Sequence, residues 1–326
     1  MRIEPAELEF DPCVAGNTIV FVLVCLSLFV CVKAVASDAL EPSGACESSV
    51  VPGVEPAKVE KVTLATVPAL IRVPERISMP PIVLWHGFGP PGDKQSLMAA
   101  LPLDDVPAAK VYLDLPLFGE RLPQGGLTEL ANRQRRDYGL EVFAPVVTGA
   151  ADELPEVIKA LQARLGTDWG DEVSLFGFSA GGAAVLLALA ENRVAVRDAI
   201  VLNAPNGLKG GVSAFETATS QDYVWSAQAK TIADRTDAVR RADEIASASL
   251  TPSLLLIHGK DDEMIPYESS VLIHESLTTY YRGSSARLHL ELVDRLDHHW
   301  TDNSNASVEL IREQISKWLR CRVAPQ

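Results

Sequence analysis

The sequence predicts an α/β fold in which helices cover both faces of a mostly parallel, doubly wound sheet. Two observations lead to this prediction. Short apolar runs recur along the chain without polar alternation, which is typical of strands that are buried on both faces. Segments with apolar residues at helical spacing lie between these runs, and alternating strands and helices build sheets of this kind.

The predicted elements begin with a β-hairpin over residues 59–65 and 69–74. Further strands are predicted at residues 82–85, 111–115, 173–177, 199–203, 253–259 and 288–293. Helices are predicted at residues 153–165, 181–193 and 307–319. Ligands of such sheets bind beyond the carboxyl ends of the strands, so the residues that follow each strand are the first candidates for function.

One connection, at about residues 206–249, is too long for a plain link between a strand and a helix. Its aromatic residues are Phe215, Tyr223 and Trp225. We interpret this segment as a short helical cap that lies over the pocket and supplies apolar walls. A surface excursion packed on the sheet is the alternative.

The chain begins with a segment of a different kind. Residues 1–36 contain an apolar run at 19–32, which is followed by Lys33 and a small-x-small pattern that ends at Ala36. This pattern predicts either a signal peptide cleaved after Ala36 or an uncleaved membrane anchor through residues 18–36. Acidic residues dominate the part before the run, which is unusual for a signal peptide.

These features predict three parts and a location. Residues 1–36 are the signal peptide or anchor, residues 37–56 are a linker rich in Ser, Gly and Pro, and residues 57–322 are the α/β domain. We expect the protein to be exported or membrane-anchored, with the domain in the periplasm or outside the cell. An anchored domain that faces the cytoplasm is the alternative.

Composition and charge exclude several classes of protein. Hydrophobic residues make up 47% of the chain and charged residues 22%, so the chain is not intrinsically disordered. With 43 acidic against 29 basic residues, the formal net charge is −14. Nucleic acid is not an expected partner, because binding to phosphates requires concentrated positive charge. Five cysteines are too few for a disulfide scaffold.

A Gly-x-Ser-x-Gly pattern at residues 177–181 follows the predicted strand at 173–177 and precedes an alanine-rich helix. A tight turn from strand to helix lifts the hydroxyl of Ser179 clear of the backbone. Gly177 and Gly181 omit the Cβ atoms that would collide in such a turn. The pattern predicts Ser179 as a nucleophile, and a plain glycine-rich turn is the alternative.

The residues 86–89, with the sequence HGFG, follow the predicted strand at 82–85. A turn in this position supplies a backbone N–H to an oxyanion hole in hydrolases that carry the serine pattern. We assign the two donors to the N–H groups of Phe88 and Ala180. His86 is expected to bond local backbone rather than to act as a base.

Two later loops offer an acid and a base. Asp261, Asp262 and Glu263 follow the strand at 253–259 and compete for one role, the orientation of a histidine. His298 and His299 follow the last predicted strand, and either could act as the base. The order serine, acid, histidine is the one that serine hydrolases use on this architecture. Adjacent histidines do not suit a tetrahedral metal site, so we expect no metal.

The motifs HGFG, GFSAGG, HGKDDEMIP and DHHW, in this order, resemble the α/β-hydrolase superfamily over roughly residues 59–319. Within it the chain is similar to small esterases and peptidases related to dienelactone hydrolase and to the catalytic domains of prolyl oligopeptidases. Residues 114–121 resemble the Asp-x-Pro-x-x-Gly-x-Arg segment of such esterases. The resemblance implies the α/β-hydrolase fold, and it selects Asp262, four residues after His258, as the acid and His298 as the base.

The resemblance has a limit at the nucleophile. Dienelactone hydrolases proper use a cysteine where this chain has Ser179, so their substrate is not implied. The expected activity is hydrolysis of a carboxylic ester through an acyl-serine intermediate, with a small-molecule ester or acyl compound as substrate and no cofactor. A serine peptidase or amidase, an acyltransferase, and a non-catalytic binding protein on the same fold are the alternatives. The substrate-binding residues are not predicted.

Overall fold

The computed structural model describes residues 57–166, 171–247, 250–302 and 305–321. The predicted signal peptide or anchor and the predicted linker lie outside the described residues, and both stay predictions. In the part of the chain that is described, no helix combines the length and the apolar character needed to cross a membrane.

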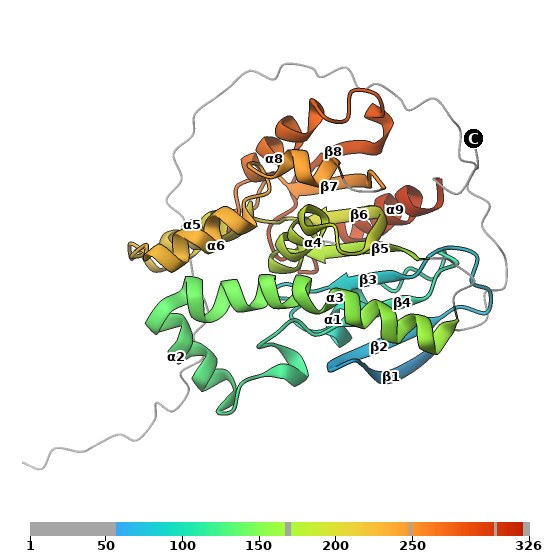
Figure 1. Ribbon diagram of the computed structural model, residues 1–326, viewed down its shortest axis with the longest axis horizontal. Helices are drawn as coiled ribbons and strands as arrows, with labels where there is room; N and C mark the ends of the chain where they lie inside the picture. The colour runs from blue at the N-terminus through green and yellow to red at the C-terminus, as the bar shows by residue number, and fades with distance from the viewer. Residues whose placement is uncertain (1–56, 167–170, 248–249, 303–304, 322–326) are drawn as a thin grey trace, which may run out of the picture. The chain divides into compact units, whose positions relative to one another are not determined.

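Eight strands within the described residues form one sheet, in the order β1-β2-β4-β3-β5-β6-β7-β8 (Figure 1). Their bounds are β1 (Lys58–Leu64), β2 (Val67–Val73), β3 (Ile82–Trp85), β4 (Lys110–Leu113), β5 (Glu172–Phe178), β6 (Ala195–Leu202), β7 (Ser253–Gly259) and β8 (Leu288–Val293). The β1–β2 and β2–β4 pairs are antiparallel, and the other pairs are parallel. The predicted fold class is confirmed: the sheet is mostly parallel and does not close.

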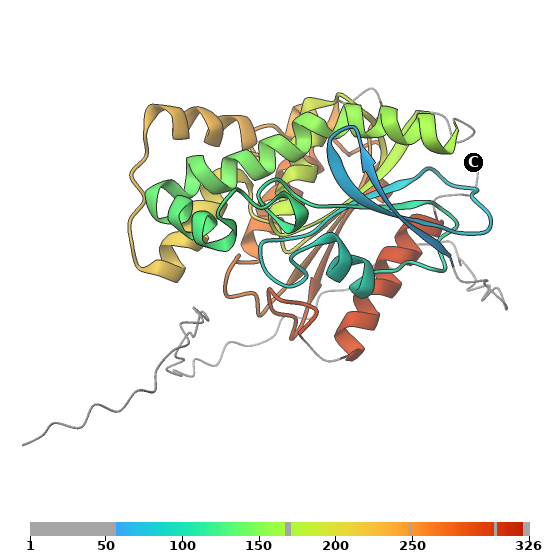
Figure 2. The same ribbon diagram turned by 90° about the horizontal axis from the view of Figure 1, so that it is seen from below.

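Helices cover both faces of this sheet. They are α1 (Lys94–Ala100), α2 (Gly126–Tyr138), α3 (Ala144–Leu165), α4 (Ala180–Glu191), α5 (Gly207–Thr219), α6 (Ala227–Thr236), α7 (Ala242–Ala246), α8 (Glu268–Thr278) and α9 (Asn305–Cys321). Short helices are η1 (Gly119–Arg121), the π-helix η2 (Gly139–Phe143) and η3 (Ser285–Arg287). Figure 2 shows α3 and α9 on opposite sides of the sheet.

The strands read as apolar runs because both of their faces are buried. Val83 and Trp85 of β3 pack into a core with residues of α3, α4 and α8. Ile82 and Leu84 of the same strand pack into a second core with residues of α1 and α9. Each apolar residue of the strand therefore enters one of two cores, and no polar alternation is possible.

Helix α3 begins at Ala144, well before the predicted start at residue 153, and it includes Pro155. Proline cannot donate the backbone hydrogen bond that the carbonyl of Ala151 would otherwise accept. In this fold Arg193 donates its Nη2 to that carbonyl at 3.1 Å. The arginine therefore replaces the missing bond and lets the helix continue through the proline.

The segment at 206–249 contains α5, α6 and α7. Helix α5 packs against α6 and against η2, which precedes α3. Figure 1 shows α5 and α6 near the beginning of α3. The segment is helical as predicted, and its role as a cap over a pocket stays a prediction.

Candidate active site

Ser179 lies in the turn between β5 and α4, with φ 54° and ψ −119°. Few residues other than glycine adopt such a backbone conformation, and it is found where a functional side chain must be presented. The flanking glycines are required by close contacts. A Cβ on Gly177 would lie 2.2 Å from the carbonyl oxygen of Gly181, and a Cβ on Gly181 would lie 2.5 Å from that of His86. The tight turn predicted from the glycine pattern is therefore present.

A line of hydrogen bonds joins Ser179, His298 and Asp262. His298 Nε2 lies 3.0 Å from Ser179 Oγ, and His298 Nδ1 lies 2.8 Å from Asp262 Oδ2. A carboxylate can only accept, so Nδ1 carries the proton and Nε2 is free to accept from the serine hydroxyl. All three side chains are buried or nearly so. The structure thus brings together the three residues that sequence and resemblance had selected.

The competing residues lie elsewhere. Asp261 and Glu263 are exposed to solvent, whereas Asp262 is 6% exposed. The ring of His299 faces the HGFG loop: a Cβ on Gly89 would lie 2.6 Å from His299 Nε2. Asp261, Glu263 and His299 therefore do not take part in the hydrogen bonds that join Ser179, His298 and Asp262.

Asp262 is surrounded by donors. Its Oδ1 accepts from the N–H groups of Met264 at 3.0 Å and Ile265 at 2.8 Å. His258 Nε2 lies 3.4 Å from Oδ2, the oxygen that also accepts from His298 Nδ1. Burial alone would raise the pKa of Asp262, but the hydrogen bonds with His258 and His298 outweigh it and lower the pKa to about 2. The carboxyl group therefore stays ionised at any pH near neutrality.

The two assigned oxyanion donors flank the serine. Ala180 is the first residue of α4, and first-turn N–H groups have no acceptor within their own helix. Phe88 follows Gly87, which approaches the serine closely: a Cβ on Gly87 would lie 3.0 Å from Ser179 Cβ. The loop that carries the N–H of Phe88 is therefore packed directly against the nucleophile turn.

His86 holds the start of this loop through its ring. Nδ1 donates to the carbonyl of Gly87 at 2.7 Å, and Nε2 accepts from the N–H of Leu115 at 3.1 Å. Burial lowers the pKa of His86, which keeps the ring neutral in this tautomer. As expected from the sequence, His86 bonds backbone, and in doing so it connects the ends of β3 and β4.

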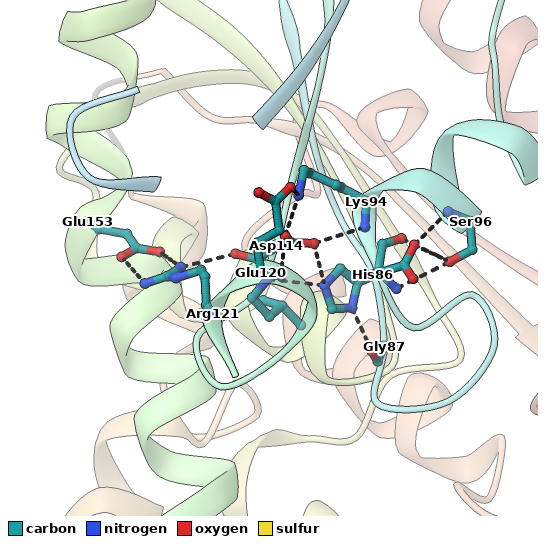
Figure 3. A network of polar contacts seen from close by, with 10 residues as sticks. His86, Gly87, Lys94, Ser96, Asp114, Glu120, Arg121 and Glu153 are labelled. Carbon is teal, nitrogen blue, oxygen red and sulfur yellow. Dashed lines mark hydrogen bonds and ion pairs between the residues drawn. The ribbon is translucent and has the colours of Figure 1, made fainter. Parts of the chain in front are cut away.

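A buried ion pair lies beside His86. Figure 3 shows Lys94 and Asp114 pointing toward each other, with Lys94 Nζ 2.5 Å from Asp114 Oδ2 and 2.5 Å from Glu120 Oε1. The Asp114 carboxylate also accepts from the N–H groups of Lys94 at 3.1 Å and Glu120 at 3.0 Å. Burial alone would lower the pKa of Lys94, but hydrogen bonds with Asp114 and Glu120 raise it. Lys94 is therefore charged and paired.

The same network explains why the segment at 114–121 contains an aspartate, a glycine and an arginine at these positions. Gly119 has φ 56°, and a Cβ there would lie 2.3 Å from the Asp114 carboxylate. Arg121 donates to the carbonyl of Asp114 at 3.0 Å and binds Glu153 of α3 through two hydrogen bonds of 2.6 and 2.9 Å. The aspartate, glycine and arginine of this segment thus attach the end of β4 to α1 and α3.

A chain of aromatic rings leads from the HGFG loop to the helical segment at 206–249. Phe88 stacks on Phe118 at a centroid distance of 4.7 Å and meets Phe143 at 6.2 Å. Phe143 meets Tyr138 at 6.2 Å, and Tyr138 stacks on Phe215 of α5 at 4.5 Å. Aromatic contacts therefore connect Phe88, one of the two residues assigned as oxyanion donors, with the helical segment at 206–249.

Sequence reasoning missed Asn203, which was placed at the end of a strand without a role. This side chain is fully buried, and its Nδ2 donates to the carbonyls of Asp297 at 3.0 Å and His298 at 3.3 Å. The available signal was its position, a polar residue directly after a buried strand at the carboxyl edge of the sheet. Within the described ranges, no group of three or more His, Cys, Asp or Glu side chains is arranged to hold a metal ion.

A protein-family model matches more than half of the chain. The model of the prolyl oligopeptidase family matches residues 148–323 of the 326-residue chain. The matched region contains Ser179, Asp262 and His298. A search of the curated proteins finds no match.

Solved structures share the fold at low sequence identity. TT1662 from Thermus thermophilus superposes with a TM-score of 0.60 at 20% identity, over 82% of this chain and 99% of that one. A putative dienelactone hydrolase from Klebsiella pneumoniae gives 0.56 at 14% identity, over 82% and 100%. An acylaminoacyl peptidase from Pyrococcus horikoshii gives 0.59 at 14% identity, over 81% of this chain and 41% of the peptidase. This chain therefore corresponds to less than half of that peptidase.

Proposed function

The chain belongs to the prolyl oligopeptidase family and has the α/β-hydrolase fold, and from this premise we propose that it cleaves a carboxylic ester through an acyl-serine intermediate. The observation that carries the proposal is the line of hydrogen bonds from Asp262 through His298 to Ser179. A serine hydroxyl is a weak nucleophile until an adjacent base accepts its proton, and this arrangement supplies the base.

In the proposed reaction, Ser179 Oγ attacks the carbonyl carbon of the ester while His298 Nε2 takes the hydroxyl proton. His298 then passes this proton to the leaving alcohol, and water later cleaves the acyl-serine bond with the same histidine as base. Asp262 holds the imidazole in the required tautomer and stabilises its charged form. The N–H groups of Phe88 and Ala180 bind the negative oxygen of the intermediate, and each such donor contributes about 3 kcal/mol to the transition state.

Peptide or amide hydrolysis is a second candidate. The matched family is that of prolyl oligopeptidase, and one structural neighbour is an acylaminoacyl peptidase. The same three side chains would serve either reaction, since both pass through an acyl-serine intermediate. An acyltransferase would also use them, with an alcohol or amine in place of water.

We also propose that the helical segment at 206–249 caps the pocket. The stacking of Phe215 on Tyr138 supports this, because it continues the aromatic chain that begins at Phe88. An apolar acyl group is the substrate portion that fits beside such rings, since burial of apolar surface drives its binding.

The test compares the wild-type protein with Ser179→Ala, each in a preparation cleared of host esterases. The wild type should be labelled by a fluorophosphonate and should hydrolyse p-nitrophenyl esters of graded acyl length. Ser179→Ala should not be labelled and should lose about 10³-fold or more in kcat. N-acylated peptides assayed in parallel show whether the protein prefers ester or peptide substrates. A wild type that is not labelled, or an alanine variant with near wild-type activity, would overturn the proposal.

A further inference from the structure

Asn203 lies where the three loops of the candidate site meet, and we infer that it is a positioning residue that holds Ser179, Asp262 and His298 in register with one another. This inference rests on the proposed function, because the register matters for catalysis only if the three residues act together. Its basis is a set of hydrogen bonds: Asn203 contacts β7 and the backbone of the base loop, and the peptide unit that joins it to Leu202 contacts the nucleophile turn.

The first contact is on the nucleophile side. Asn203 follows β6, and the carbonyl of the preceding residue, Leu202, accepts from the N–H of Ser179 at 2.9 Å. The N–H of Asn203 in turn donates to the carbonyl of Ile257 in β7 at 3.0 Å. The single peptide unit between Leu202 and Asn203 therefore joins the nucleophile turn to the strand that leads to Asp262.

The side chain of Asn203 makes the other contacts. Its Oδ1 accepts from the N–H of Gly259, the last residue of β7, at 2.9 Å. Its Nδ2 donates to the carbonyls of Asp297 and His298 at 3.0 and 3.3 Å. The acid loop and the base loop thus bind opposite ends of one amide group.

Asparagine meets all requirements at this position. The backbone of Asn203 has φ 47°, a left-handed conformation that asparagine and aspartate tolerate better than other residues with a side chain. The backbone groups around this position require a short side chain with one hydrogen-bond acceptor and two donors. The side chain at this position is fully buried, so water cannot replace it as their partner. Aspartate has the shape but no donor, and its carboxylate would face two carbonyl oxygens.

The test uses two variants of the full-length protein and one control. Asn203→Gly keeps the positive φ and removes the amide, whereas Asn203→Asp keeps the shape and removes the donors. The control is Asn192→Gly, at an exposed position with φ 47° at the end of α4. For each protein we would measure the melting transition, kcat and KM for a short ester, and the rate of fluorophosphonate labelling.

A displacement of reacting groups by about 1 Å can lower the rate about 10²-fold. Asn203→Gly should therefore melt cooperatively, lose about 100-fold in kcat and in labelling rate, and keep KM within a few-fold. Asn203→Asp should lose at least as much, and Asn192→Gly should behave as the wild type. If Asn203→Gly keeps its kcat, or if it loses the cooperative transition, the residue does not position the site and the inference fails.

A readout that needs no activity separates this inference from the proposed function. The proton on His298 Nδ1, shared with Asp262, should give a downfield NMR resonance in the wild type. It should broaden or disappear in Asn203→Gly and persist in Asn192→Gly. If the wild type shows this resonance but is neither labelled nor active, the proposed function fails while the positioning role holds. If the resonance is unchanged in Asn203→Gly, the positioning role fails.

Discussion

The two adjacent histidines of the candidate site differ in what their rings contact. His298 bonds Ser179 and Asp262, whereas His299 lies against Gly89. We expect His298→Gln to lose about 10³-fold or more in kcat for ester hydrolysis, because among the residues that the structure describes no other base is hydrogen-bonded to the serine. His299→Gln should stay within tenfold of the wild type. Steady-state kinetics on both variants tests this prediction. A larger loss of kcat in His299→Gln than in His298→Gln would assign the role of base to His299 instead.

The ionisation of Asp262 should also affect the free energy of unfolding of the protein at low pH. Its folded-state pKa of about 2 lies below its ordinary value of 3.8, so the ionised carboxyl stabilises the folded state above pH 3.8. This stabilisation, about 2 kcal/mol, is lost as the pH falls from 3.8 through 2. Urea unfolding between pH 5 and pH 2 should show this fall in the wild type and in the exposed control Asp261→Asn. The prediction is wrong if Asp262→Asn shows the same fall.

At the scale of elements, strand β4 begins with a lysine that is buried rather than exposed to solvent. Lys110 is fully buried, and its Nζ donates to the carbonyl of Val106 at 3.0 Å. Burial lowers the pKa of Lys110 from 10.5 to about 8. Below pH 8 both the folded and the unfolded chain hold the proton, so the folded chain carries the full cost of a buried charge.

Lys110→Met should therefore raise the free energy of unfolding at pH 7 by about 2 kcal/mol. The wild type should gain stability between pH 8 and 10.5, where the unfolded chain still binds the proton and the folded chain does not, and Lys110→Met should lack that gain. Denaturant titrations at several pH values test both statements. Lys159→Met, at an exposed position on α3, is the control and should change little. A destabilised Lys110→Met would contradict the argument.

The elements also show what can be predicted from sequence. Each strand was located, and most strand ends lie within two residues of the prediction, because burial on both faces leaves a continuous apolar run that needs no knowledge of partners. Strand β6 begins four residues before its predicted start. The beginning of α3 was not located, because the predicted helix has Pro155 in its first turn, whereas the observed helix begins at Ala144 and Arg193, which lies after α4, bonds the carbonyl that the proline leaves without a donor. The site motifs followed the strands and could be predicted. Asn203 and the Lys94–Asp114 pair could not, because their roles depend on partners from distant segments.

At the scale of the whole molecule, several hydrogen bonds join the predicted cap to the rest of the domain, and one of them connects it to the end of α2. Tyr223 donates its hydroxyl to Asp137 Oδ1 at 2.6 Å, and Asp137 breaks the helical geometry of α2. A bond to a carboxylate of this kind contributes about 1.5–3 kcal/mol. If the segment at 206–249 caps the pocket, loss of this bond should loosen the site for the larger substrates.

We expect Tyr223→Phe to raise KM for long-chain esters by about tenfold while leaving kcat and KM for the acetyl ester within twofold. The assay is the panel of p-nitrophenyl esters, and the control is Val224→Ala, whose side chain is 85% exposed in the wild type. Equal KM values for wild type and Tyr223→Phe across the whole panel would contradict the cap.

The side chains that form the line at Ser179 come from distant parts of the chain. His298 is 119 residues from Ser179 and 36 from Asp262, and it follows β8 at the far edge of the sheet. Contacts of such long range form late, because large loops must close first. After dilution from urea, the far-ultraviolet helical signal should return before fluorophosphonate labelling does, and simultaneous recovery would contradict this order. The nucleophile would then stay inert in a chain that is still emerging from the ribosome, until the last strand has docked.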